Sequence, residues 1–364
     1  MFCNSLVLFS VNVNRKVHLG ELDMDGPKII FDKSFLHRLK AEHLFELEVF
    51  FEIMPAPILK LEILADLSKP ESEKTDWVSV VKSLCRKMAG SAFEMVHYRQ
   101  AALGELIGGQ RVPMDGRYFI DLSAPHVSVR GHGGRHGIHV DGRIVQSEWR
   151  RWADGEFTDE ERQKGAKLRS DISELDMSAI QKLRTSMGPL FAHCKTSEAL
   201  LKEVCAFVAD PTANKQSLIF ELTMSELGVP ADARQVIARR LSQLGAQTLK
   251  DGAPYASSIT QVMFAWVALQ ARGFHGQRKS DMCDLEYLYY APFCKVFASC
   301  DRLHKTLWPT ATTTAIWCDG FELLEDLAIR AELRKSDPDR VAGPRPIPLE
   351  GSVITRIFEQ LRQR

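Results

Sequence analysis

Four acidic residues lie inside short apolar segments, and they constrain the fold of this chain more than any other feature. Asp32 follows the apolar run 28–31, Glu62 lies within 57–66, Asp284 opens 284–290, and Asp301 follows 296–300. A lone carboxylate is costly to bury in apolar surroundings. Several carboxylates gathered around divalent cations are stabilised, because Mg²⁺ and Mn²⁺ prefer hard oxygen ligands. We therefore expect the fold to bring these four side chains together around Mg²⁺ or Mn²⁺.

Composition limits the classes of function. The 364 residues suffice for one large domain or two ordinary ones. Lys plus Arg and Asp plus Glu each number 47, so no net field attracts a nucleic acid, and such a ligand needs a local basic patch. The 8 cysteines include no CxxC pair, so zinc-ribbon spacing is absent and reduced thiols are expected.

The chain is expected to be a soluble, cytoplasmic protein without a membrane segment. The apolar run within 4–13 has no basic region before it and no cleavage-like site after it, so a signal peptide is not expected. No apolar run approaches the roughly 20 residues that cross a bilayer.

Segments with strand and helix character alternate near both ends of the chain. In order they are a strand at 28–31, a helix at 34–45, a strand at 49–54, a helix at 58–67, helices at 257–269 and 284–290, a strand at 295–299, a strand at 316–318 and a helix at 320–333. This alternation predicts α/β architecture. The aromatic residues between 287 and 297 are expected to pack in its core.

The middle of the chain, 68–254, is predicted to be a mostly helical insertion with a β-hairpin-like segment near 111–145. The charged stretch 143–169 contains Trp149 and Trp152 and is a candidate nucleic-acid contact, but its Asp and Glu content favours a solvated surface. Four histidines at 126, 132, 136 and 139 lie in a glycine-rich segment without a nearby Cys. A loop that contacts nucleic acid or a partner is favoured there over a zinc site.

Three runs resemble a PIN-like nuclease domain, and they occur in the family's order. They are Ile30–Ser34, Pro55–Leu64 and Asp284–Asp301. The family has an Asp after its first strand, a Glu on a helix after a Pro-containing segment, an Asp opening a late helix, and an Asp after the next strand. The resemblance implies a PIN-like parallel sheet flanked by helices, in a discontinuous core of 1–67 and 255–364 that the insertion 68–254 interrupts.

The same resemblance implies the site. Asp32, Glu62, Asp284 and Asp301 match the catalytic, metal-binding positions of the family. Asp281 lies three residues before Asp284 and is a fifth candidate, as a ligand, an outer group or a helix cap. Two divalent ions about 4 Å apart would then support in-line cleavage of a phosphodiester.

Lys33 and His304 lie beside ligand positions and are candidate contacts for a substrate phosphate, although both could be ordinary surface residues. The expected function is a metal-dependent nuclease that favours RNA over DNA, with a toxin or defence effector as one biological role. A regulatory protein partner or a homo-oligomer fits the long insertion. The alternative is a catalytically silent PIN-like scaffold that binds RNA or a protein partner.

Overall fold

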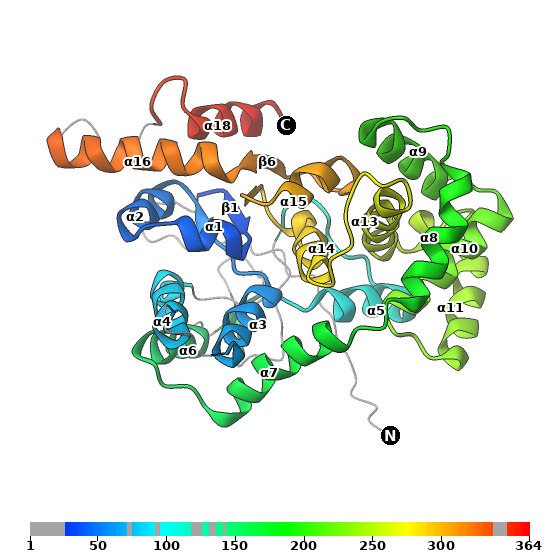
Figure 1. Cartoon of the computed structure of the whole chain (residues 1–364), viewed down its shortest axis with the longest axis horizontal. Helices are drawn as coiled ribbons and strands as arrows, with labels where there is room; N and C mark the ends of the chain where they lie inside the picture. Colours follow the sequence, from blue (N-terminus) through cyan, green and yellow to red (C-terminus); the bar gives the residue numbers. More distant parts are fainter. Residues whose placement is uncertain are drawn as a thin grey trace.

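The computed structural model describes residues 26–70, 75–91, 95–117, 126–130, 136–140, 143–337 and 348–364. The strands are β1 (Lys28–Phe31), β2 (Glu52–Ile53), β3 (His126–Arg130), β4 (His136–Val140), β5 (Val296–Ser299) and β6 (Ile316–Asp319). The helices are α1 (Lys33–Arg38), α2 (Ala41–Phe50), α3 (Pro57–Ala65), α4 (Trp77–Met88), α5 (Tyr98–Gly108), α6 (Arg143–Asp154), α7 (Asp159–Glu174), α8 (Ser178–Leu190), α9 (Ser197–Ala209), α10 (Ala213–Glu226), α11 (Ala231–Gln243), α12 (Leu249–Gly252), α13 (Pro254–Ala271), α14 (Asp281–Tyr289), α15 (Arg302–Leu307), α16 (Gly320–Ser336) and α18 (Val353–Gln363). The protein is therefore mostly helical (Figure 1), with a small sheet that confirms the predicted α/β class.

The main sheet has four strands in the order β2-β1-β5-β6, and every neighbouring pair is parallel. Phe31 lies opposite Ala298, and Ser299 lies opposite Asp319. The central strands β1 and β5 are buried, as expected for a parallel sheet covered by helices. Since all strands run the same way, their carboxyl ends meet at one edge, where open α/β sheets place their sites.

Aspartates at three strand ends cap the helices that follow. Each accepts a backbone N–H of the next helix, from Phe35 to Asp32 at 3.0 Å, from Leu303 to Asp301 at 2.6 Å and from Phe321 to Asp319 at 3.0 Å. Such a cap satisfies an N–H that has no partner inside its helix. Strand, aspartate and helix therefore succeed each other at the same edge of the sheet.

Three predicted segments differ from the structure in their extent. The helix predicted at 34–45 is divided into α1 and α2, because Leu39 and Lys40 are extended. The strand predicted at 49–54 is reduced to Glu52–Ile53, because α2 continues to Phe50. The helix predicted at 284–290 begins earlier, so that Asp281 lies in its first turn.

Helix α13 is the most deeply buried helix, with Tyr255 to Gln270 enclosed almost throughout. A helix that is apolar on all sides lies inside a protein, and α13 packs against α5, α8, α9, α10 and α14. In Figure 1 the helices α8 to α11 gather on one side of α13, away from β1. Most of these helices belong to 68–254, so this segment packs on a helix of the C-terminal region.

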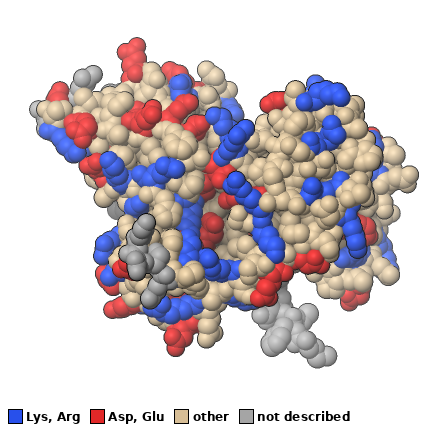
Figure 2. All heavy atoms as spheres, in the orientation of Figure 1, with Lys and Arg blue, Asp and Glu red and all other residues tan. Residues whose placement is uncertain are grey.

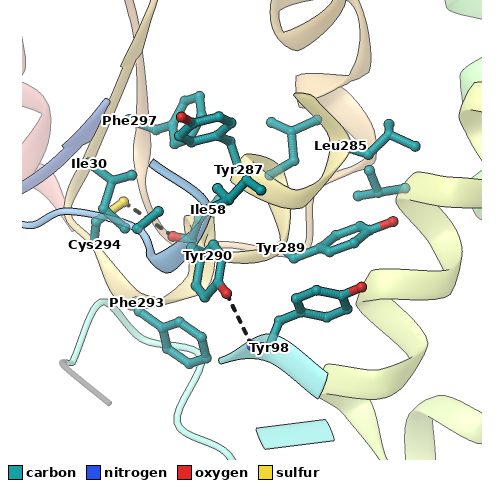
Figure 3. Close-up of a cluster of buried hydrophobic side chains, with 14 of the residues drawn as sticks. Ile30, Ile58, Tyr98, Leu285, Tyr287, Tyr289, Tyr290, Phe293, Cys294 and Phe297 are labelled. Carbon is teal, nitrogen blue, oxygen red and sulfur yellow. Dashed lines mark hydrogen bonds between the residues drawn. The ribbon is translucent and has the colours of Figure 1, made fainter. Parts of the chain in front are cut away.

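An aromatic cluster joins α14 to the sheet (Figure 3). Tyr287, Tyr289, Tyr290, Phe293 and Phe297 are all buried, which confirms the expected core packing. Phe297 on β5 lies 5.6 Å from the ring of a histidine on α15 and stacks on Trp308 at 5.4 Å. The cluster therefore fixes α14 and α15 at the end of β5.

Helix α6 packs on α4, and helix α7 packs on α3. Trp149 is 0% exposed and Trp152 is 3% exposed, and the two rings meet edge to face at 5.1 Å. The predicted solvated or nucleic-acid-binding role is therefore wrong for these two side chains, because the apolar face of α6 packs on α4. On α7, a Cβ at Gly165 would lie 2.4 Å from the Leu64 carbonyl oxygen, so glycine lets α7 pack closely on α3.

Strands β3 and β4 pair antiparallel, with His126 opposite Val140, which confirms a hairpin within 111–145. His132 and the side chains of the other three clustered histidines fall outside the described residues, so this candidate zinc or nucleic-acid site is not placed. Across the described ranges, no helix combines the length and apolarity that a membrane crossing needs.

Candidate metal centre

Asp32 and Asp301 meet at the hydroxyl of Ser299, the last residue of β5. Ser299 Oγ donates to Asp32 Oδ2 at 2.7 Å and accepts the N–H of Asp301 at 2.9 Å. The Ser34 hydroxyl donates to the same Asp32 oxygen at 2.7 Å, and Asp32 is 2% exposed. Because β1 and β5 are neighbours, their carboxyl ends bring both predicted aspartates to one place.

His304, on α15, contacts these residues and is completely buried. Its Nε2–H donates to the carbonyl oxygen of Asp284 at 2.7 Å, while Nδ1 lies 2.8 Å from Ser299 Oγ and 3.3 Å from Asp32 Oδ2. A carbonyl oxygen only accepts, and the Ser299 proton goes to Asp32, so both ring nitrogens donate and the ring is positively charged. Burial lowers the pKa of His304, but the hydrogen bond and charge of Asp32 outweigh burial and raise this pKa to about 9.

These contacts leave His304 no free ring nitrogen for a substrate phosphate. Sequence analysis made it a candidate phosphate contact, whereas the structure has its ring enclosed and both nitrogens engaged. It therefore orients Asp32 and α14. Burial raises the pKa of Asp32, but the hydrogen bond and charge of His304 overcome burial, and the net effect is a lowered pKa. Asp32 is consequently held in its ionised form.

Glu62 reaches the same region from α3. Its Oε2 accepts the hydroxyl of Tyr287 at 2.6 Å. Burial raises the pKa of Glu62, the charge of Lys33 and the Tyr287 hydrogen bond oppose that rise, and the charge of Asp32 adds to it. Lys33 is itself engaged, since its Nζ donates to the Glu62 carbonyl oxygen at 2.8 Å and pairs with Asp66 at 2.7 Å. Lys33 therefore joins α1 to α3.

Asp284 is half-buried in the first turn of α14. Burial raises its pKa to about 7, the charge of His304 opposes the rise, and the charges of Asp301, Glu62 and Asp32 add to it. These three carboxylates therefore lie within electrostatic range of Asp284. Helix α14 contacts both α3 and α15, and Figure 1 shows it next to these two helices. The carboxyl group of Asp284 therefore lies within electrostatic range of the other three predicted carboxylates, near the carboxyl edge of the sheet.

Asp281 lies in a different contact. Its Oδ2 accepts the indole N–H of Trp266 at 3.1 Å and lies 2.8 Å from Nε2 of His275. Asp281 is 3% exposed. Its spacing from Asp284 predicted a shared face, but its carboxylate faces α13 and the chain that precedes α14. Asp281 therefore anchors α14 to α13.

Sequence analysis did not identify Ser299, Tyr287, Asp319 or Glu286. Asp319 follows the same pattern of an aspartate between a strand and a helix, and that signal could have found it. In the structure it caps α16 and pairs with Lys305 at 2.9 Å. Glu286 has no local signal beyond its position near Asp284; burial raises its pKa to about 8, against the charge of Arg99.

The donor set fits a hard divalent cation, because it consists of carboxylate oxygens. In the part of the chain that the structure describes, however, no three or more His, Cys, Asp or Glu side chains are arranged to hold a metal ion as they stand. The contacts explain this arrangement, since Ser34 and Ser299 hold Asp32 and Tyr287 holds Glu62. A metal ion could therefore bind here only if these side chains rotated away from their present partners.

A hollow of about 280 Å³ lies along the edge strand β6. Trp317, Asp319, Glu322 and Arg356 are among the residues that line it. It includes none of the four converging carboxylates, so it is separate from the candidate metal centre.

Comparison of this chain with protein-family models, with curated proteins and with solved structures gives no match in any of the three. The functional argument therefore depends on the chain's own residues and their geometry.

Proposed function

We propose that this protein is a metal-dependent nuclease with a PIN-like core, which hydrolyses phosphodiester bonds and favours RNA over DNA. The observation that carries the proposal is the convergence of Asp32, Glu62, Asp284 and Asp301 at the carboxyl edge of a parallel sheet. The four residues come from two neighbouring strand ends and two helices, in the chain order that the PIN-like resemblance implies.

The four carboxylates would hold Mg²⁺ or Mn²⁺. The cation would supply Lewis acidity for an in-line displacement at phosphorus. In the free protein Asp32 is held by Ser299 and His304 and stays ionised, so it can turn from Ser299 towards a cation without first losing a proton. Asp284 and Asp301 are half-buried and open to solvent, so a substrate phosphate meets this side of the site first.

A nucleic-acid substrate also needs cations near the site, because the whole chain has a net charge of +0. Figure 2 shows Lys and Arg side chains along the middle of the face drawn in Figure 1, beside Asp and Glu side chains. Basic side chains on this face support binding of a polyanion such as a nucleic acid. The preference for RNA comes from the PIN-like resemblance.

Cleavage of single-stranded RNA by the purified protein in Mn²⁺ tests the proposal. We expect EDTA to stop cleavage, and Asp284→Ala and Asp301→Ala each to lower the rate by about 100-fold or more, since each removes a metal ligand. Asp319→Asn is the matched control, because this aspartate also ends a strand but caps α16 and pairs with Lys305. We expect it to retain most of the activity. Wild-type rates in both alanine variants would refute the assignment of the site.

A catalytically silent scaffold that binds RNA is the second candidate. It is favoured by the protein contacts that already occupy Asp32 and Glu62. The scaffold predicts RNA binding that EDTA leaves unchanged and no cleavage with Mg²⁺ or Mn²⁺. The two candidates therefore give opposite results in the same assay.

A further inference from the structure

A second polar cluster lies beside the candidate metal centre, where α5, α10 and α14 meet. It consists of Tyr98 and Arg99 at the start of α5, Glu226 at the end of α10, and Glu286 and Tyr289 on α14. We call this set the Glu226–Glu286 cluster. The cleavage chemistry proposed above uses none of its members.

Hydrogen bonds organise the cluster. Arg99 Nε donates to the Tyr98 hydroxyl at 2.9 Å, and the carboxyl of Glu226 lies within electrostatic range of this hydroxyl. On the other side, the Tyr290 hydroxyl donates to Glu286 Oε1 at 3.3 Å and accepts the N–H of Tyr98 at 3.1 Å (Figure 3). Two carboxyls from separate helices are thereby brought to one place, within range of the Arg99 charge.

The hydroxyl of Tyr289 has no hydrogen-bond partner, although Tyr289 is 3% exposed. The groups that act on this hydroxyl electrostatically include Glu226, Tyr98 and Glu286, so it points into the cluster. In Figure 3 the phenol oxygens of Tyr98 and Tyr289 point to the same side. A buried hydroxyl without a partner is unfavourable, so an incoming ligand that bonds to it gains affinity.

The cluster opens to solvent at an aromatic rim. The His97 side chain is 40% exposed, and its ring stacks on Tyr98 at 4.7 Å with an interplanar angle of 29°. Its Nε2 lies 3.6 Å from Glu286 Oε1, and Arg99 beside it is exposed. An exposed flat ring next to buried carboxyl oxygens suits a flat ligand with N–H donors on its edge.

The cluster also borders the metal centre. Glu286 follows Asp284 by two residues on α14, so the two side chains lie on different sides of the helix. The charges of Glu62, Glu286 and Asp284 all act on the thiol of Cys283, so the three carboxyls lie in one neighbourhood. A nucleotide whose phosphate lies at the metal centre can therefore place its base towards the cluster.

We propose that the Glu226–Glu286 cluster binds the base of the nucleotide next to the cleaved phosphodiester, and that this base is guanine. The proposal rests on the nuclease function argued above. Guanine has two adjacent donors on one edge, N1–H and the N2 amino group, which match the two oxygens of an ionised carboxylate. Bonds from these donors and the charge of Arg99 favour the ionised form of Glu286 against the effect of burial. Adenine, cytosine and uracil lack this pair of adjacent donors. The His97 ring supplies a stacking surface, which is how proteins hold unpaired bases.

Binding of the four free nucleosides in EDTA tests the proposal apart from metal and phosphate. We expect guanosine to bind about 10-fold or more tightly than adenosine, cytidine or uridine, a difference of about 1.4 kcal/mol. Glu286→Gln should remove that preference, because an amide presents one acceptor and one donor. Asp284→Asn should keep it, because Asp284 lies outside the cluster.

Tyr289→Phe is the second variant, and it separates binding from folding. It removes a hydroxyl that has no partner in the free protein, so we expect the melting temperature to stay the same or rise while guanosine binds more weakly. Equal binding of all four nucleosides, or no guanosine binding at all, would overturn the proposal. No guanosine binding is also the result expected if the cluster instead binds a lysine or arginine side chain of a partner protein.

The outcomes also distinguish the two proposals. Guanosine selectivity in a protein that neither binds Mn²⁺ nor cleaves RNA would refute the nuclease and leave a guanine-binding cluster. Mn²⁺-dependent cleavage without guanosine selectivity would refute the cluster assignment and leave the nuclease.

Discussion

Glu105 on α5 is a buried carboxyl outside both proposed sites, and it shows how this protein accommodates such a group. Its Oε2 accepts the N–H of Ala256 at 3.0 Å, at the start of the buried helix α13. Burial raises the pKa of Glu105 to about 7, although backbone N–H groups and the charge of Arg240 oppose the rise. The folded protein therefore keeps a proton on Glu105 that the unfolded chain loses at lower pH.

Stability should depend on pH through Glu105. The folded-state pKa of Glu105 is about 7 and its ordinary value is 4.5, so the contribution of Glu105 to the free energy of unfolding is greatest below pH 4.5 and is lost as pH rises to about 7. Glu105→Gln cannot ionise and still offers an oxygen to the Ala256 N–H. We expect this variant to be more stable than wild type above pH 7, by on the order of 1–2 kcal/mol in urea unfolding.

The matched control is Glu359→Gln, which changes an exposed carboxylate on α18. It should follow the wild-type dependence of stability on pH. A Glu105→Gln variant with the wild-type slope between pH 4.5 and 7 would show that Glu105 ionises normally in the folded protein.

For single residues, the sequence predicts a position in the site only where the neighbouring residues in the chain indicate it. Asp32 and Asp301 end apolar runs just before helices, and the structure places both at one edge of the sheet. The surroundings of Asp281 depend on Trp266 and His275, and the burial of His304 depends on β5 and α14. Such contacts arise only when the elements pack, so residue spacing alone could not predict them.

Among the elements, the start of α16 packs directly against the end of β5, beside the candidate metal centre. A Cβ at Gly320 would lie 2.8 Å from the carbonyl carbon of Ser299 and 2.9 Å from the nitrogen of Cys300. Glycine therefore lets α16 begin directly against the end of β5, at the residue that joins Asp32 to Asp301.

Gly320→Ala should force α16 or the end of β5 to shift, because the close atoms belong to backbone. We expect a loss of about 1–3 kcal/mol in the free energy of unfolding, as overpacking usually costs, together with weaker Mn²⁺ binding. Gly276→Ala is the control, since a Cβ there meets nothing within 4 Å and its backbone requires no positive φ. Equal stability of the two variants would show that the approach of α16 to β5 is not tight.

The elements themselves were predictable to different degrees. Hydrophobic runs with flanking aspartates predicted β1, β5 and β6, because these strands are short, buried and bounded by helix caps. The break at Leu39 and Lys40 and the short β2 were not predicted. Both depend on how α2 packs against α16, and periodicity along the chain does not contain that information.

At the scale of the whole molecule, the small parallel sheet and the surrounding helices share one continuous core. The segment 68–254 contributes to both sides of it, through α7 against α3 and through α8, α9 and α10 against α13. Glu62 therefore depends on α7 for its position, and the Glu226–Glu286 cluster depends on α10 and α14. The long middle segment is thus part of the framework that positions both proposed sites.

The most direct test of the central claim is the change in thermal stability of EDTA-treated protein as Mn²⁺ is added. A cation that binds only the folded state stabilises it by about 2.7 kcal/mol at 100 times its Kd, so the melting temperature of wild type should rise and saturate. Asp284→Asn and Asp32→Asn should lose most of this gain, whereas Asp319→Asn should keep it. A wild-type protein without a saturable rise, or an Asp284→Asn variant with the full rise, would contradict a metal centre at these carboxylates.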